Sequence, residues 1–345
     1  MLGDIQRFPI KWLSANGDYV YPPTPNNPEW KELEDYLDKV EACRIPQEVL
    51  KSLSDEQLVQ AIIDYPLIYD VFFFSDVNKG VAHLAKTCDA FAELLERETA
   101  KDVLLDVIMS EAEDKSINML TENGESDSRL ANKTVRDEIV FDTLVAITIF
   151  QERIGAELSD EELASLADVS DEMDIYAPMV AIPGVVIKKK YGVMKTPNGL
   201  NVCYAFTECN HTEKQHQEAD AEMVNTYGVT LVSSGTCIYN CHSYAWYNQS
   251  VSNDRWIDDP SPYMQDGSYT KVSGGSINSS AASAISGDIV VYGGLSHSAV
   301  MVGNGGGEPF ATRTMISKWG QRGIFMHRGS QVPYDLDEIS VWRRN

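Results

Sequence analysis

Basic residues are scarce in this sequence of 345 residues, which has 28 Lys and Arg against 52 Asp and Glu and a net charge of −24. A surface this acidic repels phosphate backbones and anionic lipids, so nucleic acid and membrane surfaces are excluded as main partners. The excess of negative charge is distributed unevenly along the chain, because residues 235–345 carry nine acidic and eight basic side chains. Almost all of it therefore lies before Gly235, which indicates two units with different surfaces.

Long apolar runs are also missing. The longest ones, such as residues 71–74, have the length of a core segment, far below the roughly 20 residues that span a bilayer. We therefore expect no transmembrane segment. The first residues, Met1-Leu2-Gly3-Asp4, do not resemble a signal peptide. Two locations remain open: a cytosolic protein, or a secreted or cell-surface protein whose signal was removed.

Cysteine is too rare, with six residues, to build a disulfide scaffold in a chain of this length. Isolated bridges remain possible. The candidate pairs are Cys203 with Cys209 across a hairpin, Cys43 with Cys88 across two helices, and Cys237 with Cys241.

The composition, 43% hydrophobic and 23% charged, is ordinary for a globular protein, and the length suits two domains. Residues 1–174 are expected to form a helical domain of unknown role. Capping boxes begin at Ser54 and Ser159. Apolar periodicity predicts helices over 55–65, 81–97 and 135–154 and from about residue 100, with a polar loop over 112–133.

The pattern changes after Asp174. A turn signature at 196–199 lies between two expected strands, 185–187 and 202–206, and residues 213–227 are expected to be a helix. Residues 175–234 would extend the sheet of the C-terminal region or form a small bridging unit. From Gly235 the sequence predicts a cysteine-bearing helix, an irregular loop and a meander of strands over 288–292, 297–302, 312–318 and 324–327, with loops at 276–286 and 303–307.

Cys241 and His297 have the residue types and settings of a nucleophile and its base. Asn240 is a candidate N-cap, which would place the Cys241 thiol in a first helical turn, where backbone N–H groups stabilise a thiolate and an oxyanion. His297 opens an apolar strand after a Gly-rich turn and is expected to face that helix. An imidazole beside a thiol is the arrangement of cysteine hydrolases.

A third polar group must hold the imidazole. If the strand at 297 pairs antiparallel with the next, His297 lies near residues 316–318. Ser317 is therefore predicted as the orienting residue, with His327 and Glu308 as alternatives. His211 and His216 stand in a polar segment and are expected at the surface, and His242 is expected to be structural. The spacing Cys237-x-x-x-Cys241-His242 does not match haem attachment.

This arrangement resembles the NlpC-type and CHAP-type amidases of the papain-like class. The resemblance rests on the Asn240-Cys241 helix start, the Gly287-Asp288 strand opening and the His297-Ser-Ala-Val strand, in that order. Ser317-Lys-Trp-Gly320 with His327 also resembles the end of such bacterial domains. The resemblance covers about residues 235–334, under a third of the chain. NlpC-type enzymes read Asp-Cys-Ser-Gly at the nucleophile, whereas this chain reads Asn-Cys-His-Ser.

The resemblance implies an α+β protein, in which a helical domain precedes a papain-like domain over residues 175–345. It implies a cysteine peptidase or amidase that cleaves peptide or isopeptide bonds, with a peptidoglycan-like substrate in the bacterial cell wall. The reaction needs no metal and no organic cofactor. The alternatives are a transglutaminase-like acyl transferase and a non-catalytic secreted binding or adhesion module, in which Cys241 is a buried small residue and His297 a strand-end histidine.

Overall fold

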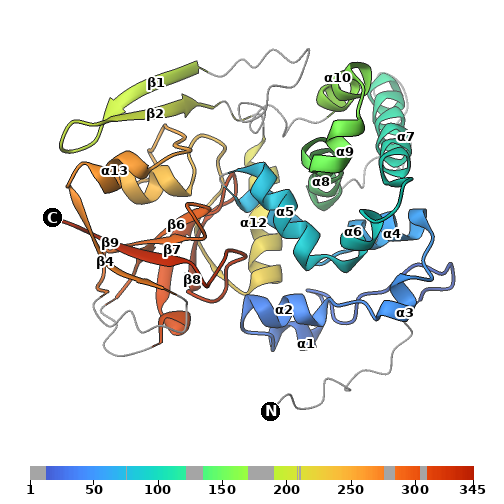
Figure 1. Ribbon diagram of the computed structural model, residues 1–345, viewed down its shortest axis with the longest axis horizontal. Helices are drawn as coiled ribbons and strands as arrows, with labels where there is room; N and C mark the ends of the chain where they lie inside the picture. The colour runs from blue at the N-terminus through green and yellow to red at the C-terminus, as the bar shows by residue number, and fades with distance from the viewer. Residues whose placement is uncertain are drawn as a thin grey trace. The chain divides into compact units, whose positions relative to one another are not determined.

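The computed structural model describes residues 13–74, 76–121, 135–169, 190–207, 209, 211–275, 284–303 and 309–345 (Figure 1). The chain divides into two compact units: Met1–Tyr69 with Val81–Asp171, and Asp70–Gly80 with Glu172–Asn345. The main division lies close to the expected one between residues 174 and 175. Residues 70–80, expected in the helical domain, belong to the second unit instead.

The first unit is helical, as expected. Its capping boxes are present, because Ser54 Oγ accepts from the Gln57 N–H and Ser159 Oγ from the Glu162 N–H, both at 3.2 Å. Its elements, with two that continue into the second unit, are α1 (Pro28–Lys31), α2 (Tyr36–Ala42), α3 (Gln47–Leu50), α4 (Asp55–Ile63), η1 (Ile68–Phe73), α5 (Val77–Thr87), α6 (Asp89–Leu94), α7 (Ala100–Thr121), α8 (Val135–Phe150), α9 (Glu152–Glu157) and α10 (Asp160–Val169).

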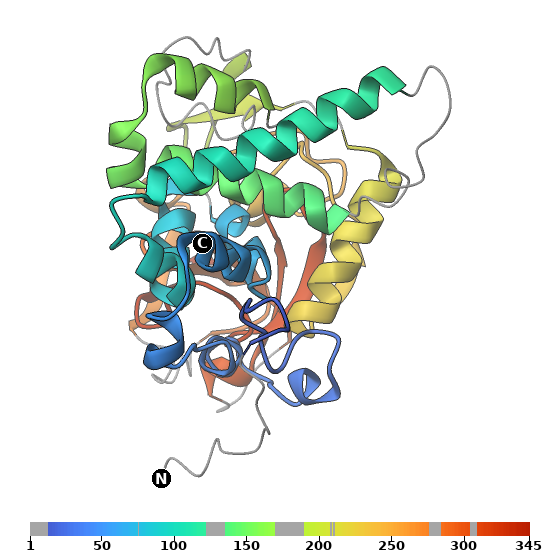
Figure 2. The same cartoon turned by 90° about the vertical axis from the view of Figure 1, so that its right-hand side faces the viewer.

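Three predictions for this unit differ from the structure. The helix expected over 135–154 ends at Phe150, and α9 begins after Gln151, which is extended. The helix expected over 81–97 is two helices, α5 and α6, which meet at Cys88 in an extended conformation. The loop expected over 112–133 begins later, because α7 continues to Thr121, and residues 122–134 lie outside the described residues. Helices α7 and α8 lie side by side (Figure 2), and residues 139–150 of α8 are buried on every side. Such a helix has no polar stripe to mark its orientation.

The second unit is built on an antiparallel sheet of seven strands in the order β3-β8-β7-β6-β5-β9-β4. A separate hairpin joins β1 and β2. The expected strands 202–206, 288–292, 297–302, 312–318 and 324–327 are confirmed within a few residues, and the expected strand 185–187 lies outside the described residues. The strands are β1 (Lys190–Lys195), β2 (Asn201–Phe206), β3 (Thr230–Ser233), β4 (Tyr269–Gly275), β5 (Ile289–Tyr292), β6 (His297–Met301), β7 (Thr314–Lys318), β8 (Ile324–Arg328) and β9 (Ile339–Arg344).

Short helices accompany this sheet. Helix α12 (Glu213–Tyr227) has the expected bounds, begins with a capping box at Thr212 and ends at Gly228, whose φ is 71°. It lies beside the edge of the sheet at β3 (Figure 2). The π-helix η3 (Ser243–Tyr247) contacts β6 and β7. The remaining helices of this unit are α13 (Ser261–Gln265) and the 3₁₀ turn η4 (Phe310–Thr312).

Both faces of β6 are buried. Val300 packs in a core with Ala245 and Trp246 of η3, so Val300 and Ser298 point toward this helix. Side chains alternate along a strand, so His297, Ala299 and Met301 point to the opposite face of the sheet.

Side chains of Asp70, Phe73 and Phe74 pack on that opposite face. Asp70 Oδ1 accepts from the Tyr227 hydroxyl at 2.5 Å, and the Phe73 carbonyl accepts from the Tyr334 hydroxyl at 2.9 Å. Phe73 also meets the rings of Tyr227 and Trp319. A fragment that starts near residue 184 would therefore lose part of its own core, which corrects the expectation of a simple division at residue 174.

Among the residues that the structure describes, no helix combines the length and the apolar composition needed to cross a membrane.

Candidate functional site

Cys241 is the first residue of a helical segment whose second part is η3. Asn240 caps this segment, because its Oδ1 accepts from the Ser243 N–H at 3.1 Å. The same side chain is held in turn by its Nδ2, which donates to the Ile257 carbonyl at 2.7 Å. The predicted N-cap and the predicted position of the thiol in a first helical turn are therefore confirmed.

The Cys241 thiol is buried, with 1% of the residue exposed. Burial raises the pKa of this thiol to about 11, while the backbone N–H groups of Ser298, His242 and Cys241 and the charge of Lys318 act in the opposite direction. The thiol is thus protonated at neutral pH. The groups that lower the pKa of this thiol nevertheless include the backbone N–H of Ser298, which belongs to the same strand as His297.

Lys318 is a fully buried basic residue of this region. Its Nζ donates to the carbonyls of Thr236, Gly320 and Arg322 at 2.9, 2.6 and 2.5 Å. Burial lowers the pKa of Lys318 to about 7, and Asp220 opposes that shift. Three acceptors match the three N–H donors of an ammonium group, so these carbonyls favour the charged form, which in turn favours a thiolate at Cys241.

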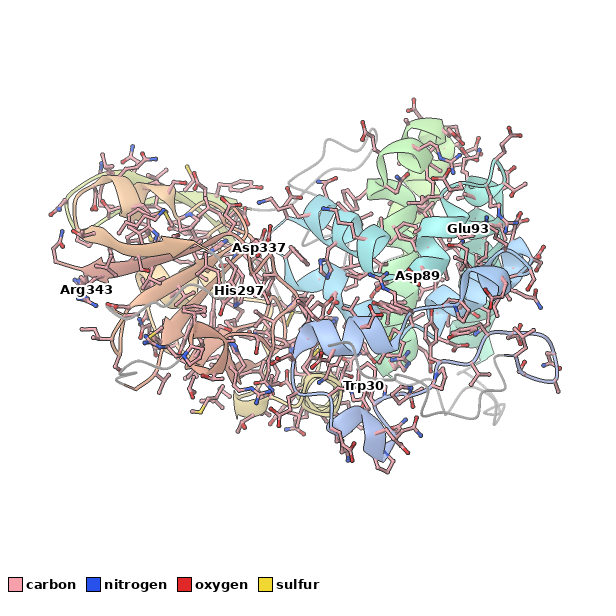
Figure 3. The ribbon with its side chains drawn as sticks, turned by 60° about the horizontal axis from the view of Figure 1, so that its bottom comes forward. Trp30, Asp89, Glu93, His297, Asp337 and Arg343 are labelled. Atoms are coloured by element: carbon pink, nitrogen blue, oxygen red, sulfur yellow. A yellow bond between two sulfur atoms is a disulfide. The ribbon has the colours of Figure 1, made fainter. Side chains whose placement is uncertain are left out.

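His297 is fully buried within the second unit (Figure 3). Its ring stacks on Tyr334, with 4.2 Å between centroids and 10° between planes. Among the described residues, neither ring nitrogen has a hydrogen-bond partner. Burial, followed by the neighbouring His327 and His242, lowers the pKa of His297 far below its usual value, so this imidazole is neutral.

The structure does not join Cys241 and His297 by a hydrogen bond. The helix-facing side chain at the start of β6 is that of Ser298, whose Oγ pairs with His242 Nδ1 at 2.8 Å and accepts from Trp246 Nε1 at 3.0 Å. The His297 ring points to the other face, contrary to the expectation that it faces the helix. The backbone N–H of Ser298, the residue after His297, lowers the pKa of the Cys241 thiol. The pairing of Cys241 with His297 stays a prediction.

Ser317, the predicted orienting residue, bonds to another histidine. Strands β6 and β7 are antiparallel, as expected, and Val300 pairs with Ile316, so Ser317 shares a face with His297. Its Oγ pairs with His327 Nε2 at 2.8 Å and accepts from Trp319 Nε1 at 3.0 Å. Ser317 therefore orients His327 here. Glu308, the other alternative, lies outside the described residues.

We expect Ser317→Ala to lower the free energy of unfolding by about 1–3 kcal/mol, because it leaves His327 Nε2 and Trp319 Nε1 buried without this partner. Ser340→Ala is the matched control, since Ser340 accepts from Trp342 Nε1 at 2.9 Å in a partly exposed setting, where water replaces the lost bond. Urea unfolding followed by tryptophan fluorescence would measure both. Equal losses of unfolding free energy in the two variants would show that the buried hydrogen bonds of Ser317 contribute no more to stability than the partly exposed one of Ser340.

The structure brings together a second cluster of four side chains that was not predicted from the sequence. The ligand atoms of Cys209, His211, His216 and Cys237 lie within 4.8 Å of one another. Cys209 and Cys237 form a disulfide with 5.0 Å between their Cα atoms, whereas none of the three cysteine pairs expected from the sequence is bonded. His216 is buried rather than on the surface. The signal in the sequence was the spacing Cys-x-His-x-x-x-x-His, completed by a distant cysteine.

A comparison with models of known protein families, with curated protein sequences and with solved structures finds no match to this chain.

Proposed function

We propose that the second unit is a cysteine-dependent hydrolase of peptide or isopeptide bonds, with Cys241 as nucleophile and His297 as base. The observation that supports it most is the environment of the Cys241 sulfur. Cys241 begins a helical segment that lies against β6, the strand that starts with a neutral histidine, and the backbone N–H groups of Ser298, His242 and Cys241 lower the pKa of its thiol. Such groups stabilise a thiolate and the oxyanion of an acyl intermediate.

On this proposal Cys241 Sγ attacks the amide carbonyl while the imidazole takes the thiol proton. The same proton then passes to the leaving amine, and water releases the acyl group from sulfur. The reaction requires the His297 ring to reach the sulfur. A peptide of the bacterial cell wall remains the proposed substrate, as the resemblance of residues 235–334 implies, and a secreted or cell-surface location goes with it.

A second candidate is a non-catalytic binding module. It is favoured by the two His297 nitrogens, which are buried and have no hydrogen-bond partner among the residues that the structure describes, and by the buried thiol. An acyl transferase shares the chemistry of the hydrolase and differs in its acceptor, so an added amine would appear in its product.

Labelling by an electrophile that mimics a peptide carbonyl tests the proposal in the full chain. Cys88 is the matched control, because it is equally buried, precedes a helix and has its pKa raised to about 12 by burial. The pKa of about 11 for Cys241 against about 12 for Cys88 by itself makes Cys241 roughly tenfold faster. A hydrolase predicts a ratio of at least about a thousandfold at neutral pH, because an adjacent imidazole assists thiolate formation. A ratio near tenfold or below would leave the binding module as the better description. Mass spectrometry of the labelled peptides gives both rates.

A further inference from the structure

The cluster of Cys209, His211, His216 and Cys237 has no part in the proposed reaction. Its contacts pair each sulfur with one imidazole: Cys209 Sγ is 3.1 Å from His216 Nε2, and Cys237 Sγ is 3.5 Å from His211 Nδ1. The Cys237 N–H also donates to Cys209 Sγ at 3.3 Å. The four residues come from the chain after β2, the first turn of α12 and the stretch that leads to Cys241.

Two sulfurs and two imidazole nitrogens are the ligand set of a tetrahedral zinc site. Bonds of about 2.3 Å to sulfur and about 2.0–2.1 Å to nitrogen place the ligand atoms of such a site about 3.3–3.8 Å apart. The two sulfur–nitrogen contacts here, 3.1 and 3.5 Å, are close to that range. Calcium and magnesium prefer oxygen ligands, so the donor set selects zinc or a similar borderline-soft ion.

A disulfide alone does not account for this arrangement, because a disulfide needs no imidazole and here each sulfur has one beside it. The disulfide and a metal site use the same two sulfurs, so they exclude one another. Reduction by a dithiol transfers two electrons and two protons to the cystine, gives two thiols and leaves the reductant oxidised. A zinc ion then displaces the two thiol protons when the thiolates bind it.

We propose that Cys209, His211, His216 and Cys237 bind one Zn²⁺ ion when the two cysteines are reduced. This inference goes beyond the proposed hydrolase and does not depend on it.

The surrounding contacts indicate what the ion would hold. A Cβ on Gly235 would lie 2.9 Å from His216 Nδ1, so the chain before Cys237 passes directly over the ring. Asp220 of α12 fixes the same chain, since its carboxylate accepts from the Gly235 N–H at 2.7 Å and from the Gly323 N–H at 2.6 Å. The metal would therefore connect α12 and the chain after β2 to residues 235–240, the segment that precedes Cys241.

The full chain, purified with a dithiol reductant, supplied with Zn²⁺ and dialysed, tests the site. We expect about one zinc per chain by mass spectrometry of the metal, two cysteines protected from a thiol reagent until a chelator is added, and a fall in Tm on chelation. Substitution by Co²⁺ should give the absorption bands of a tetrahedral thiolate site.

His211→Ala is the decisive variant, because His211 is half-buried and is not part of the disulfide, whereas Cys237→Ser removes a buried residue and tests folding as well. His211→Ala should lose the retained zinc and the cobalt bands, while Cys203→Ala, which removes an exposed cysteine of the same unit, should keep both. Reduced protein without bound zinc, or a His211→Ala variant that retains zinc like the parent chain, would overturn the proposal. So would a disulfide that persists under the reductant.

Discussion

Cys241→Ala is expected to abolish amide hydrolysis, by roughly 10⁴-fold or more, while the chain stays folded. The substitution removes one buried sulfur and keeps a side chain of similar shape, so its effect on stability should be small. His297→Ala should cost nearly as much activity, because nucleophile and base act as a unit. The double variant should then be no slower than either single variant.

The measurement is the release of new amines and peptides from peptidoglycan and from small peptide amides, identified by mass spectrometry. Cys203→Ala is the matched control, since it removes an exposed cysteine of the same unit. Turnover that survives Cys241→Ala would exclude the proposed nucleophile. Turnover that survives His297→Ala alone would instead keep the nucleophile and assign the base to another group.

The second unit is expected to unfold in mild acid. The pH of this unfolding should be well above the pH at which protonation of carboxylates alone would unfold it. Burial lowers the pKa of both His242 and His327 from 6.5 to about 4, and that of His297 further. For His242 the Leu295 carbonyl and Asp259 oppose this shift and Lys79 adds to it. A positive charge on His327 or His242 further disfavours a proton on His297.

The sign of the effect is set by the proton balance. Between pH 6.5 and about 4 the unfolded chain binds protons at these histidines and the folded chain does not, so the free energy of unfolding falls as the pH falls. A pKa shift from 6.5 to about 4 in one histidine corresponds to a loss of about 3 kcal/mol in the free energy of unfolding once the pH has fallen below about 4. That is a large part of the roughly 5–15 kcal/mol that stabilises a typical domain.

Urea unfolding at a series of pH values measures the effect, and tryptophan fluorescence reports mainly on this unit because it holds four of the six tryptophans, Trp246, Trp256, Trp319 and Trp342. His327→Gln should reduce the pH slope near pH 5 by about one proton, or about 1.4 kcal/mol per pH unit. Ser340→Ala, which removes no titratable group, is the control and should leave the slope unchanged. A slope that is the same in His327→Gln and the parent chain would show that His327 does not stay neutral.

Local chemistry was enough to predict several elements. The capping boxes at Ser54 and Ser159 mark real helix starts, and residues 213–227 form a helix with the predicted bounds. Asn240 was identified as a cap because a short polar side chain before a helix satisfies N–H groups that have no other partner. The meander from β5 to β8 was predicted from short apolar runs between turn residues. These features depend on neighbours in the sequence, so the sequence alone is sufficient to find them.

The face of β6 on which His297 lies was decided only by the tertiary structure. Every residue of β6 is buried, so the alternation of apolar and polar residues that normally reveals the two faces of a strand is absent. The register of the sheet and the position of η3 determine that Ser298, and not His297, faces the helix. The antiparallel pairing of β6 and β7 was enough to predict that Ser317 lies on the strand next to His297. The hydrogen-bond partner of Ser317 is His327 of β8, which could not be inferred from the pairing with β6.

By itself the sequence determined the helical first unit, the antiparallel meander of the second and a capped helix that begins at Cys241, because these depend on capping, periodicity and turn chemistry over a few residues. Only the tertiary structure decided three further matters. It assigned residues 70–80 to the second unit, turned His297 away from the helix, and brought Cys209, His211 and His216 to Cys237. Each depends on contacts between residues far apart in the chain, where packing in three dimensions, and not local preference, determines which side chains meet.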